Sequence, residues 1–277
     1  MKIVRGIYKK ARTYFYLLCP ILFLIVSCEM FEYSPNQSFD ENSPIAINKK
    51  NINWLLLNGN QDDTIRIVFT GDSQRVYDEA ELLKEKVNTM DGIDMMILAG
   101  DISDFGVLNE FEWIHEIFSQ MKVPYISVIG NHDIISNGDE VYKKMYGDLN
   151  FSFVFDSVKF VFHNSNSREY RFNGSVPDMN WLRGEFTEEA GVTHTIPVSH
   201  VPPYSTDFDS ELISDYTTSI KNAPGILVSL HGHLHNMGDG YPFNDGVRYI
   251  NSNSVGKRKF ILLEISKGKI VKTLVDY

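Results

Sequence analysis

Residues 65–74 read Ile-Arg-Ile-Val-Phe-Thr-Gly-Asp-Ser-Gln, an apolar run that stops at Asp72 and Gln74. Four further apolar runs also end in residues that can bind a hard metal ion. They end in Gly100-Asp101, Gly130-Asn131-His132, His200 and His231-Gly232-His233-Leu234-His235. Strands that stop in this way place side chains at the carboxyl ends of a sheet, where open α/β sheets bind ligands. We therefore expect one site rich in oxygen and imidazole groups, a composition that suits Mn, Fe or Zn.

Strand and helix patterns alternate in the first half of the chain. Strands are expected at 64–70, 94–99 and 125–129, with helices at 76–90 and 109–121. This order is typical of βαβ units with a buried parallel sheet.

The second half adds antiparallel signals. Hairpins are expected over 151–163, turning at Asp156-Ser157, and over 259–276, turning at Lys267-Gly268. Further strands are expected at 193–199, 225–230 and 247–251, and helices at 178–188 and 207–222. The mixture predicts an α/β fold of two packed mixed β-sheets flanked by helices.

The first 27 residues differ from the rest in composition. A basic segment with five Lys and Arg and no acidic residue precedes the apolar run 14–26, which fits the core of a secretion signal. Ile25-Val26-Ser27-Cys28 resembles a bacterial lipobox, in which the cysteine is lipidated. We expect a lipoprotein signal peptide at 1–27, a tether and short pre-domain segment at 28–62, and the main domain at 63–277. A plain signal peptide or an uncleaved anchor are the alternatives.

This reading places the protein in the bacterial cell envelope, on the periplasmic or outer surface, held to the membrane by a lipid at Cys28. The formal charge is −10, and loss of residues 1–27 would bring it to −15. Such an acidic chain argues against a nucleic-acid surface, which would need a basic face. It permits a small phosphorylated substrate, because bound cations reverse the local field.

The candidate metal ligands carry oxygen or nitrogen rather than sulfur. The only cysteines are Cys19 and Cys28, so the mature domain would hold no thiolate site. Seven ligands are too many for one tetrahedral zinc but suffice for two metals that share a carboxylate. They are Asp72, Gln74, Asp101, Asn131, His200, His233 and His235.

The order of these blocks resembles that of the calcineurin-like metallophosphoesterases over roughly residues 63–255. The blocks are Gly71-Asp72-x-Gln74, Gly100-Asp101-x-x-Asp104, Gly130-Asn131-His132-Asp133, His200-x-Pro202-Pro203 and Gly232-His233-x-His235. The resemblance implies an α/β/β/α sandwich for the domain at 63–277. It also implies hydrolysis of a phosphoester by a hydroxide that bridges two divalent metal ions.

The resemblance also implies a role for each site residue. Asp101 would bridge the two metals, and His132 would act as general acid or orient the substrate. Asp104 would hydrogen-bond to His132 and fix its tautomer. The first metal would be held by Asp72, Gln74 and His235, and the second by Asn131, His200 and His233.

Two departures from the family pattern bear on chemistry. The family usually has His where this chain has Gln74; a neutral oxygen ligand favours a harder ion, so Mn is favoured over Fe and Zn. The arginines that clamp a phosphomonoester in protein phosphatases are absent, which tilts the prediction mildly to phosphodiesters. Arg75 either takes their place or is simply solvated. A phosphomonoesterase, or a non-catalytic envelope binding protein on a decayed fold, are the alternatives.

Substrate specificity is expected to lie in the loops 164–177 and 201–215, where Tyr204 could line a pocket. His231 is either structural or orients one of the ligands.

Overall fold

The computed structural model describes residues 38–59 and 62–277 of the chain. The unit Glu41–Tyr277 carries the fold discussed below. The predicted signal peptide and Cys28 lie outside the described residues. Within the described part of the chain, no helix is both long and apolar enough to cross a bilayer.

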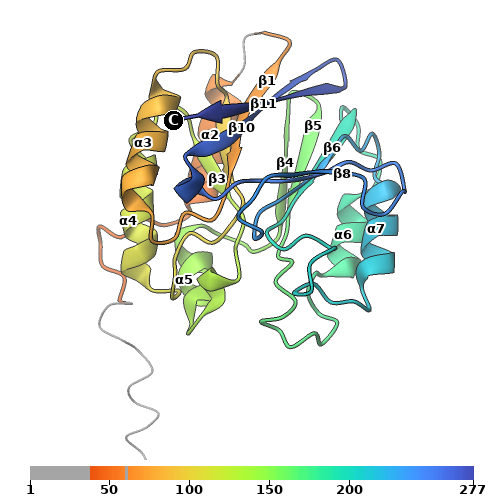
Figure 1. The fold of residues 1–277 in the computed structure, drawn as a ribbon, viewed down its shortest axis with the longest axis horizontal. Helices are drawn as coiled ribbons and strands as arrows, with labels where there is room; N and C mark the ends of the chain where they lie inside the picture. The colour runs from red at the N-terminus through yellow and green to blue at the C-terminus, as the bar shows by residue number, and fades with distance from the viewer. Residues whose placement is uncertain (1–37, 60–61) are drawn as a thin grey trace, which may run out of the picture. The chain divides into compact units, whose positions relative to one another are not determined.

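Two mixed sheets form the centre of the unit Glu41–Tyr277 (Figure 1), which confirms the predicted fold class. The first sheet has the order β11-β10-β1-β2-β3 and the second has the order β4-β5-β6-β7-β9-β8. Strands β1, β2 and β3 run parallel, whereas β10 pairs antiparallel with both β1 and β11. The strands of the first sheet are β1 (Ile65–Thr70), β2 (Met95–Leu98), β3 (Tyr125–Ser127), β10 (Lys259–Ser266) and β11 (Lys269–Asp276).

In the second sheet, β5, β6, β7 and β9 run parallel and the two edge strands are antiparallel. Its strands are β4 (Phe151–Phe155), β5 (Val158–Phe162), β6 (His194–Val198), β7 (Ser229–His231), β8 (Gly238–Gly240) and β9 (Tyr249–Asn251). The carboxyl ends of both sets of parallel strands supply the loops of the candidate site.

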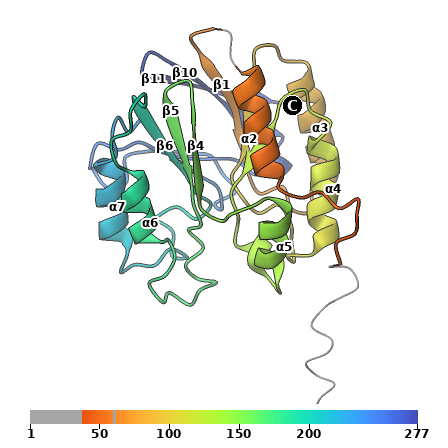
Figure 2. The same cartoon turned by 180° about the vertical axis from the view of Figure 1, so that it is seen from behind.

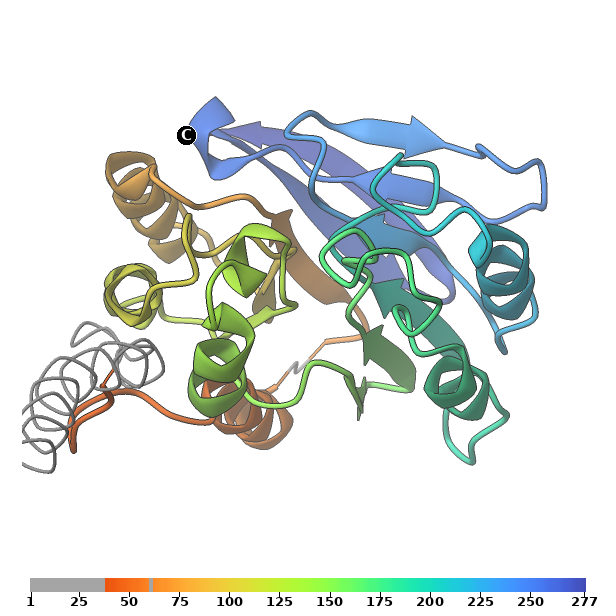
Figure 3. The same cartoon turned by 90° about the horizontal axis from the view of Figure 1, so that it is seen from below.

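Helices cover the outer faces of the two sheets (Figures 1 and 2). Helices α3 (Tyr77–Asn88) and α4 (Leu108–Phe118) flank the first sheet, and α6 (Met179–Glu185) and α7 (Ile213–Lys221) flank the second. Seen from below, these two helix pairs lie on opposite sides of the sheets (Figure 3). The sequence also explains where α6 begins. Asp178 caps this helix by accepting hydrogen bonds from the amides of Asn180 and Trp181, both at 3.0 Å.

The main hydrophobic core lies between the sheets. Alternate residues of β1, β2 and β10 face alternate residues of β4, β5 and β6, as period-two strands require. A second core lies beneath α6 and α7 and includes Val161, Leu182 and Tyr216. Because β5 contributes Phe160 to the first core and Val161 to the second, the second sheet is buried on both faces.

The two predicted hairpins are confirmed. Asp156 and Ser157 have φ of 47° and 63°, and Lys267 and Gly268 have φ of 51° and 71°. Two successive residues with positive φ are typical of the two-residue turns whose twist matches antiparallel strands.

Helix α2 (Ile47–Asn58) belongs to the folded unit, although it precedes the predicted domain start at Asp63. Leu55 enters the main core. The side-chain NH₂ of Asn48 donates to the Ser127 carbonyl at 3.0 Å, and its Oδ1 atom accepts from the Ser127 amide at 2.9 Å. Asn51 donates to the carbonyl of Tyr125 at 2.6 Å. These side chains fasten α2 to β3, so the segment before Asp63 is more than a connection.

Several elements differ from the sequence-based expectations, among them β7, which begins at Ser229 and not at the predicted residue 225. Helix α5 (Gly138–Met145) and strand β8 were not predicted. Helix α7 begins at Ile213, later than the predicted start at 207. The intervening residues form turns, in which the Asp209 carboxylate accepts a hydrogen bond from the Glu211 amide at 3.0 Å.

Candidate metal centre

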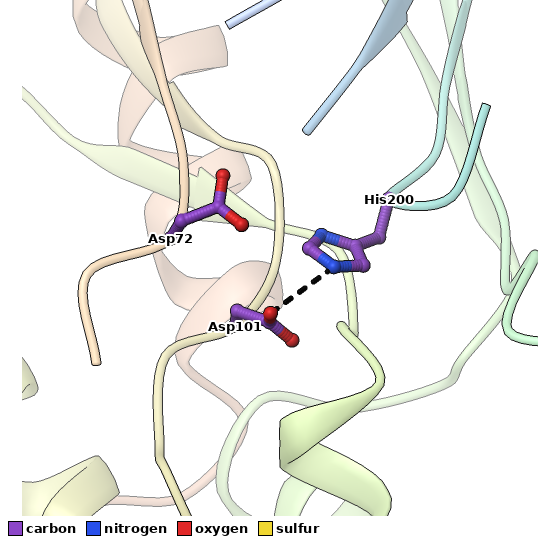
Figure 4. A group of neighbouring side chains, drawn as sticks. All are labelled: Asp72, Asp101 and His200. Carbon is purple, nitrogen blue, oxygen red and sulfur yellow. Dashed lines mark ion pairs between the residues drawn. The ribbon is translucent and has the colours of Figure 1, made fainter. Parts of the chain in front are cut away.

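The centre of the site is formed by Asp72, Asp101 and His200, which follow β1, β2 and β6. Their ligand atoms all lie within 4.8 Å of one another, and all three side chains are buried. Figure 4 shows them pointing toward a common point, with the Nε2 atom of His200 3.3 Å from the Oδ2 atom of Asp101. The Nδ1 atom of His200 lies 2.6 Å from the Ala99 carbonyl oxygen, which fixes the orientation of the imidazole.

The other predicted ligands surround this group. The Oδ1 atom of Asn131 lies 3.0 Å from Nε2 of His200 and 2.9 Å from Nδ1 of His233. Nε2 of His235 lies 3.3 Å from Oδ1 of Asp72. The Gln74 amide donates to Oδ2 of Asp101 at 3.4 Å. All seven candidate ligands are therefore brought together.

Several oxygen atoms of the site need a partner. Both carboxylate oxygens of Asp72 and the Oε1 atom of Gln74 are buried without a hydrogen bond from any residue in 38–59 or 62–277. The contact of Asp72 with His235 has an ion-pair distance but not hydrogen-bond geometry. Burying such acceptors alone is costly. A divalent cation would satisfy them, so the residues present fit a metal centre.

Burial and pairing set the charges of these groups. Burial raises the pKa of Asp72 to about 8. Burial also opposes ionisation of Asp101, but the neighbouring His200 outweighs it and lowers the pKa of that carboxyl. Burial alone would lower the pKa of His200, yet the charge of Asp101 raises it to about 10. Burial lowers the pKa of His233 to about 4, which keeps a nitrogen lone pair available for a metal.

The backbone at the site is held in an uncommon conformation. Asp72, Asp101, His233 and His235 have φ of 54°, 54°, 72° and 59°, in the left-handed region. For residues other than glycine this costs on the order of 1–3 kcal/mol each and is found where the surroundings enforce it. Gly130 is required for a different reason, namely space: a Cβ there would lie 2.1 Å from the amide nitrogen of Asp101.

His132 lies beside Asp104 and next to the metal ligands. Its Nδ1 atom is 3.1 Å from the Asp104 carbonyl oxygen and 3.4 Å from Oδ1 of the Asp104 carboxylate. Its backbone amide donates to Oδ1 of Asp101 at 2.9 Å. A proton on Nδ1 is thus held by Asp104, and Nε2 is left for other partners.

Asp133 joins the loops of the second and third blocks. Its buried carboxylate accepts hydrogen bonds from the amides of Ile102, Ser103 and Gly130, at 2.9, 2.8 and 2.8 Å. These contacts place the loop of Asp101 against that of His132.

Asp207 is a site residue that sequence reasoning missed. Its Oδ2 atom lies 3.2 Å from Nε2 of His233, and its Oδ1 atom accepts a hydrogen bond from Arg168 at 3.0 Å. A carboxylate on this nitrogen fixes the tautomer that presents Nδ1 to the metal centre. No strand precedes Asp207, so the pattern that marked the other residues does not mark it.

The contacts of Arg75 and His231 show the roles that the sequence left open. The Nε atom of Arg75 lies 2.5 Å from Oδ2 of Asp104, and its guanidinium lies 5.6 Å from the ring centre of Phe105. Both ring nitrogens of His231 contact serine hydroxyls, those of Ser199 at 3.0 Å and Ser229 at 2.9 Å. His231 therefore has a structural role.

Comparison with known proteins identifies the family. The family model described as calcineurin-like phosphoesterase matches residues 65–237, more than half of the chain. The chain belongs to the calcineurin-like phosphoesterase family. The family is one of phosphoesterases that depend on two metal ions.

A probable cyclic nucleotide phosphodiesterase of Xenorhabdus bovienii is 30% identical over 64 residues. That match covers 22% of this chain and 26% of the relative.

Two solved structures show that the calcineurin-like fold is shared at low sequence identity. A dimetal phosphatase from Danio rerio aligns with a TM-score of 0.60 at 11% identity, covering 78% of this chain and 100% of that one. GAP50, the anchor in the inner membrane complex of Plasmodium, aligns with a TM-score of 0.59 at 16% identity, covering 78% and 85%. At these identities the likeness concerns the fold alone.

Proposed function

We propose that this chain hydrolyses phosphodiesters with two divalent metal ions, manganese being favoured, held at the site around Asp72, Asp101 and His200. The observation that carries the proposal is the buried group of carboxylate and amide oxygens that lack hydrogen-bond donors. When bound, two such ions would polarise the phosphoryl oxygens and activate water.

Asp101 would serve both metal ions, and each ion would have three further ligands. Asp72, Gln74 and His235 would hold the first ion, and Asn131, His200 and His233 the second. Contacts support this division, because His235 approaches Asp72 whereas His200 and His233 meet at the Asn131 oxygen. The unpartnered Oε1 atom of Gln74 supports its role as an oxygen ligand, which favours a hard ion such as manganese.

His132 is the general acid of the proposed reaction. Asp104 accepts the Nδ1–H hydrogen bond, and in the doubly protonated imidazolium form of His132 the Nε2–H would be the proton given to the oxygen of the leaving group, which leaves the neutral imidazole. Asp101 positions His132 through its backbone amide. General acid catalysis of this kind contributes roughly 10²–10⁴-fold in rate.

The preference for diesters rests on charge. A phosphomonoester dianion needs more cationic support than a diester, and in this chain Arg75 is already paired with Asp104. The name of the Xenorhabdus relative, a probable cyclic nucleotide phosphodiesterase, agrees with a diester substrate.

The proposed location is the bacterial cell envelope, with a lipid anchor at Cys28. Its support is the sequence alone: a basic segment, an apolar run and the lipobox-like residues 25–28. Incorporation of an alkyne-labelled fatty acid, lost in Cys28→Ser, would test it. Equal labelling of the variant would exclude lipidation at this residue.

The deciding experiment is a manganese-loaded screen of matched mono- and diesters with good and poor leaving groups. We expect higher kcat/KM for diesters. His132→Ala should retain two metal ions and lose most rate on poor leaving groups, while His194→Ala, remote from the site, should behave as the parent. An equal loss on good and poor leaving groups would refute the acid role. Preference for monoesters would favour a phosphomonoesterase, and a metal-loaded chain without any hydrolysis would favour a binding protein.

A further inference from the structure

A pocket of about 590 Å³ has no role in the chemistry described so far. It is formed mainly by the loop after β6, with one side chain from each of two other loops. Its lining includes both aromatic and acidic side chains. The residues that decide its chemistry are Phe172, Tyr204, Phe208, Asp209, Glu211 and Phe243.

The loop that forms the pocket also reaches the metal site. Asp207, whose carboxylate contacts His233, stands between two pocket residues, Thr206 and Phe208. Neighbouring Cα atoms are about 3.8 Å apart, so the pocket begins one residue from a group in contact with a metal ligand. A substrate bound at the metals through a phosphate could therefore place its organic part in this pocket.

Two aromatic side chains of the pocket are unusually open. Phe172 is 46% exposed and Tyr204 is 37% exposed. Phe172 has a φ of 51°, a conformation that is costly for a bulky residue. Exposed rings held in this manner provide faces on which another flat ring can stack.

Asp209, in the pocket lining, carries a buried oxygen without a hydrogen-bond donor from the described residues. Its side chain is only 3% exposed, and its Oδ1 atom accepts the Glu211 amide at 3.0 Å. Its Oδ2 atom is buried without a hydrogen bond from any residue in the described ranges. A buried carboxylate oxygen of this kind calls for a donor, and the pocket is where a donor can enter.

We propose that this pocket binds the nucleobase of a nucleotide substrate. The ring would stack on Phe172 and Tyr204, and its exocyclic amino group would donate to Oδ2 of Asp209. The proposal rests on the proposed phosphoesterase function and specifies its substrate class.

The charges of the pocket support this assignment. Its lining includes the carboxylates of Asp209 and Glu211 and no lysine or arginine. A second phosphate or a carboxylate would be repelled there, whereas an uncharged ring with N–H donors would not. The phosphate thus belongs to the metal centre and the base to the pocket.

Binding of nucleosides without phosphate tests the pocket separately from catalysis. We would titrate the full metal-free chain with adenosine, with purine riboside, which lacks the amino group, and with inosine, which has a carbonyl in its place. The parent should bind adenosine about tenfold or more tighter than the other two, as expected for a hydrogen bond to a charged group. Cytidine and uridine repeat the comparison with a smaller ring.

Two variants sharpen the test. Asp209→Asn keeps the oxygen that caps Glu211 but replaces Oδ2 by an amide donor, so the preference should shift from adenosine to inosine. Phe172→Ala should weaken adenosine binding about 5- to 100-fold, the range for loss of a stacking partner. Tyr241→Ala, an exposed aromatic outside the pocket lining, serves as the control and should not change binding.

The outcomes separate the two proposals. If the chain hydrolyses simple diesters but binds adenosine, purine riboside and inosine equally, the pocket assignment is wrong and the proposed function stands. If nucleosides bind with the expected preference but no phosphoester is cleaved, the pocket is right and the catalytic proposal fails. An unchanged preference in Asp209→Asn would also overturn the assignment of Oδ2.

Discussion

Asp101→Asn is the most informative substitution, because Asp101 contacts most parts of the site. Its Oδ1 atom accepts the His132 amide at 2.9 Å, and its Oδ2 atom lies 3.4 Å from the Gln74 amide and 3.3 Å from Nε2 of His200. Asparagine offers one oxygen and one NH₂ group. Whichever way it is turned, the NH₂ group faces a donor.

The size of the effect follows from burial. Breaking one partner of a fully buried ion pair costs about 3–5 kcal/mol. We therefore expect the metal-free unfolding free energy to fall by about 3 kcal/mol, or roughly 6–12 °C in Tm for a unit of this size. Manganese affinity should fall at least about 100-fold, since loss of groups that only support a ligand already costs about 10–100-fold.

Calorimetric manganese titration, hydrolysis of a chromogenic diester and thermal unfolding in chelator measure these three effects. Asp94→Asn is a matched control: Asp94 accepts the Arg66 amide at 2.7 Å and lies at the amino end of β2, away from the site. The control should keep parental metal binding and turnover. A variant Asp101→Asn that binds two manganese ions with parental affinity and turns over normally would refute the bridging role.

Three further predictions concern other parts of the molecule. Asp207→Asn should weaken manganese binding about 10–100-fold by releasing His233, as measured by calorimetry; an unchanged affinity would show that this contact does not matter. Leu55→Ala should lower the unfolding free energy measured in urea by about 2–5 kcal/mol. Leu57→Ala, at a site 85% exposed, should lower it by less than about 0.5 kcal/mol. Equal losses would show that α2 is not an integral part of the fold. Burial lowers the pKa of His163 to about 4, below its unfolded value near 6.5, so its contribution to stability is present above pH 6.5 and lost as pH falls toward 4. In chelator, His163→Gln should reduce the change of the unfolding free energy with pH, between pH 6.5 and 4, by up to about 1.4 kcal/mol per pH unit. An unchanged pH dependence would contradict the assignment.

The strands and their polar ends were predictable because both signals are local. β1 is an apolar run followed directly by Gly71 and Asp72, and that order is visible without any tertiary information. The hairpins were predictable for the same reason, since Asp156-Ser157 tolerates the positive φ that a tight turn requires. In each case the structure is determined by a few residues that are neighbours in the sequence.

The features that were missed depend on contacts between distant segments. Asp207 reaches His233 only because its loop folds back over the site. A short helix was expected at 52–57, but its attachment to β3 was not, since that depends on Asn48 and Asn51, polar residues that a hydrophobic pattern does not count. Helix α5 starts at Gly138, a residue more typical of a turn, and its buried side includes Val141 and Met145. A single sequence does not record such partners.

The left-handed conformation of Asp72, Asp101, His233 and His235 has an evolutionary consequence. At each position glycine would relieve the backbone, so the fold alone would favour that replacement. The proposed role in metal binding would oppose it. A homologue that carries glycine at several of these positions would be expected to have abandoned metal chemistry while gaining thermal robustness.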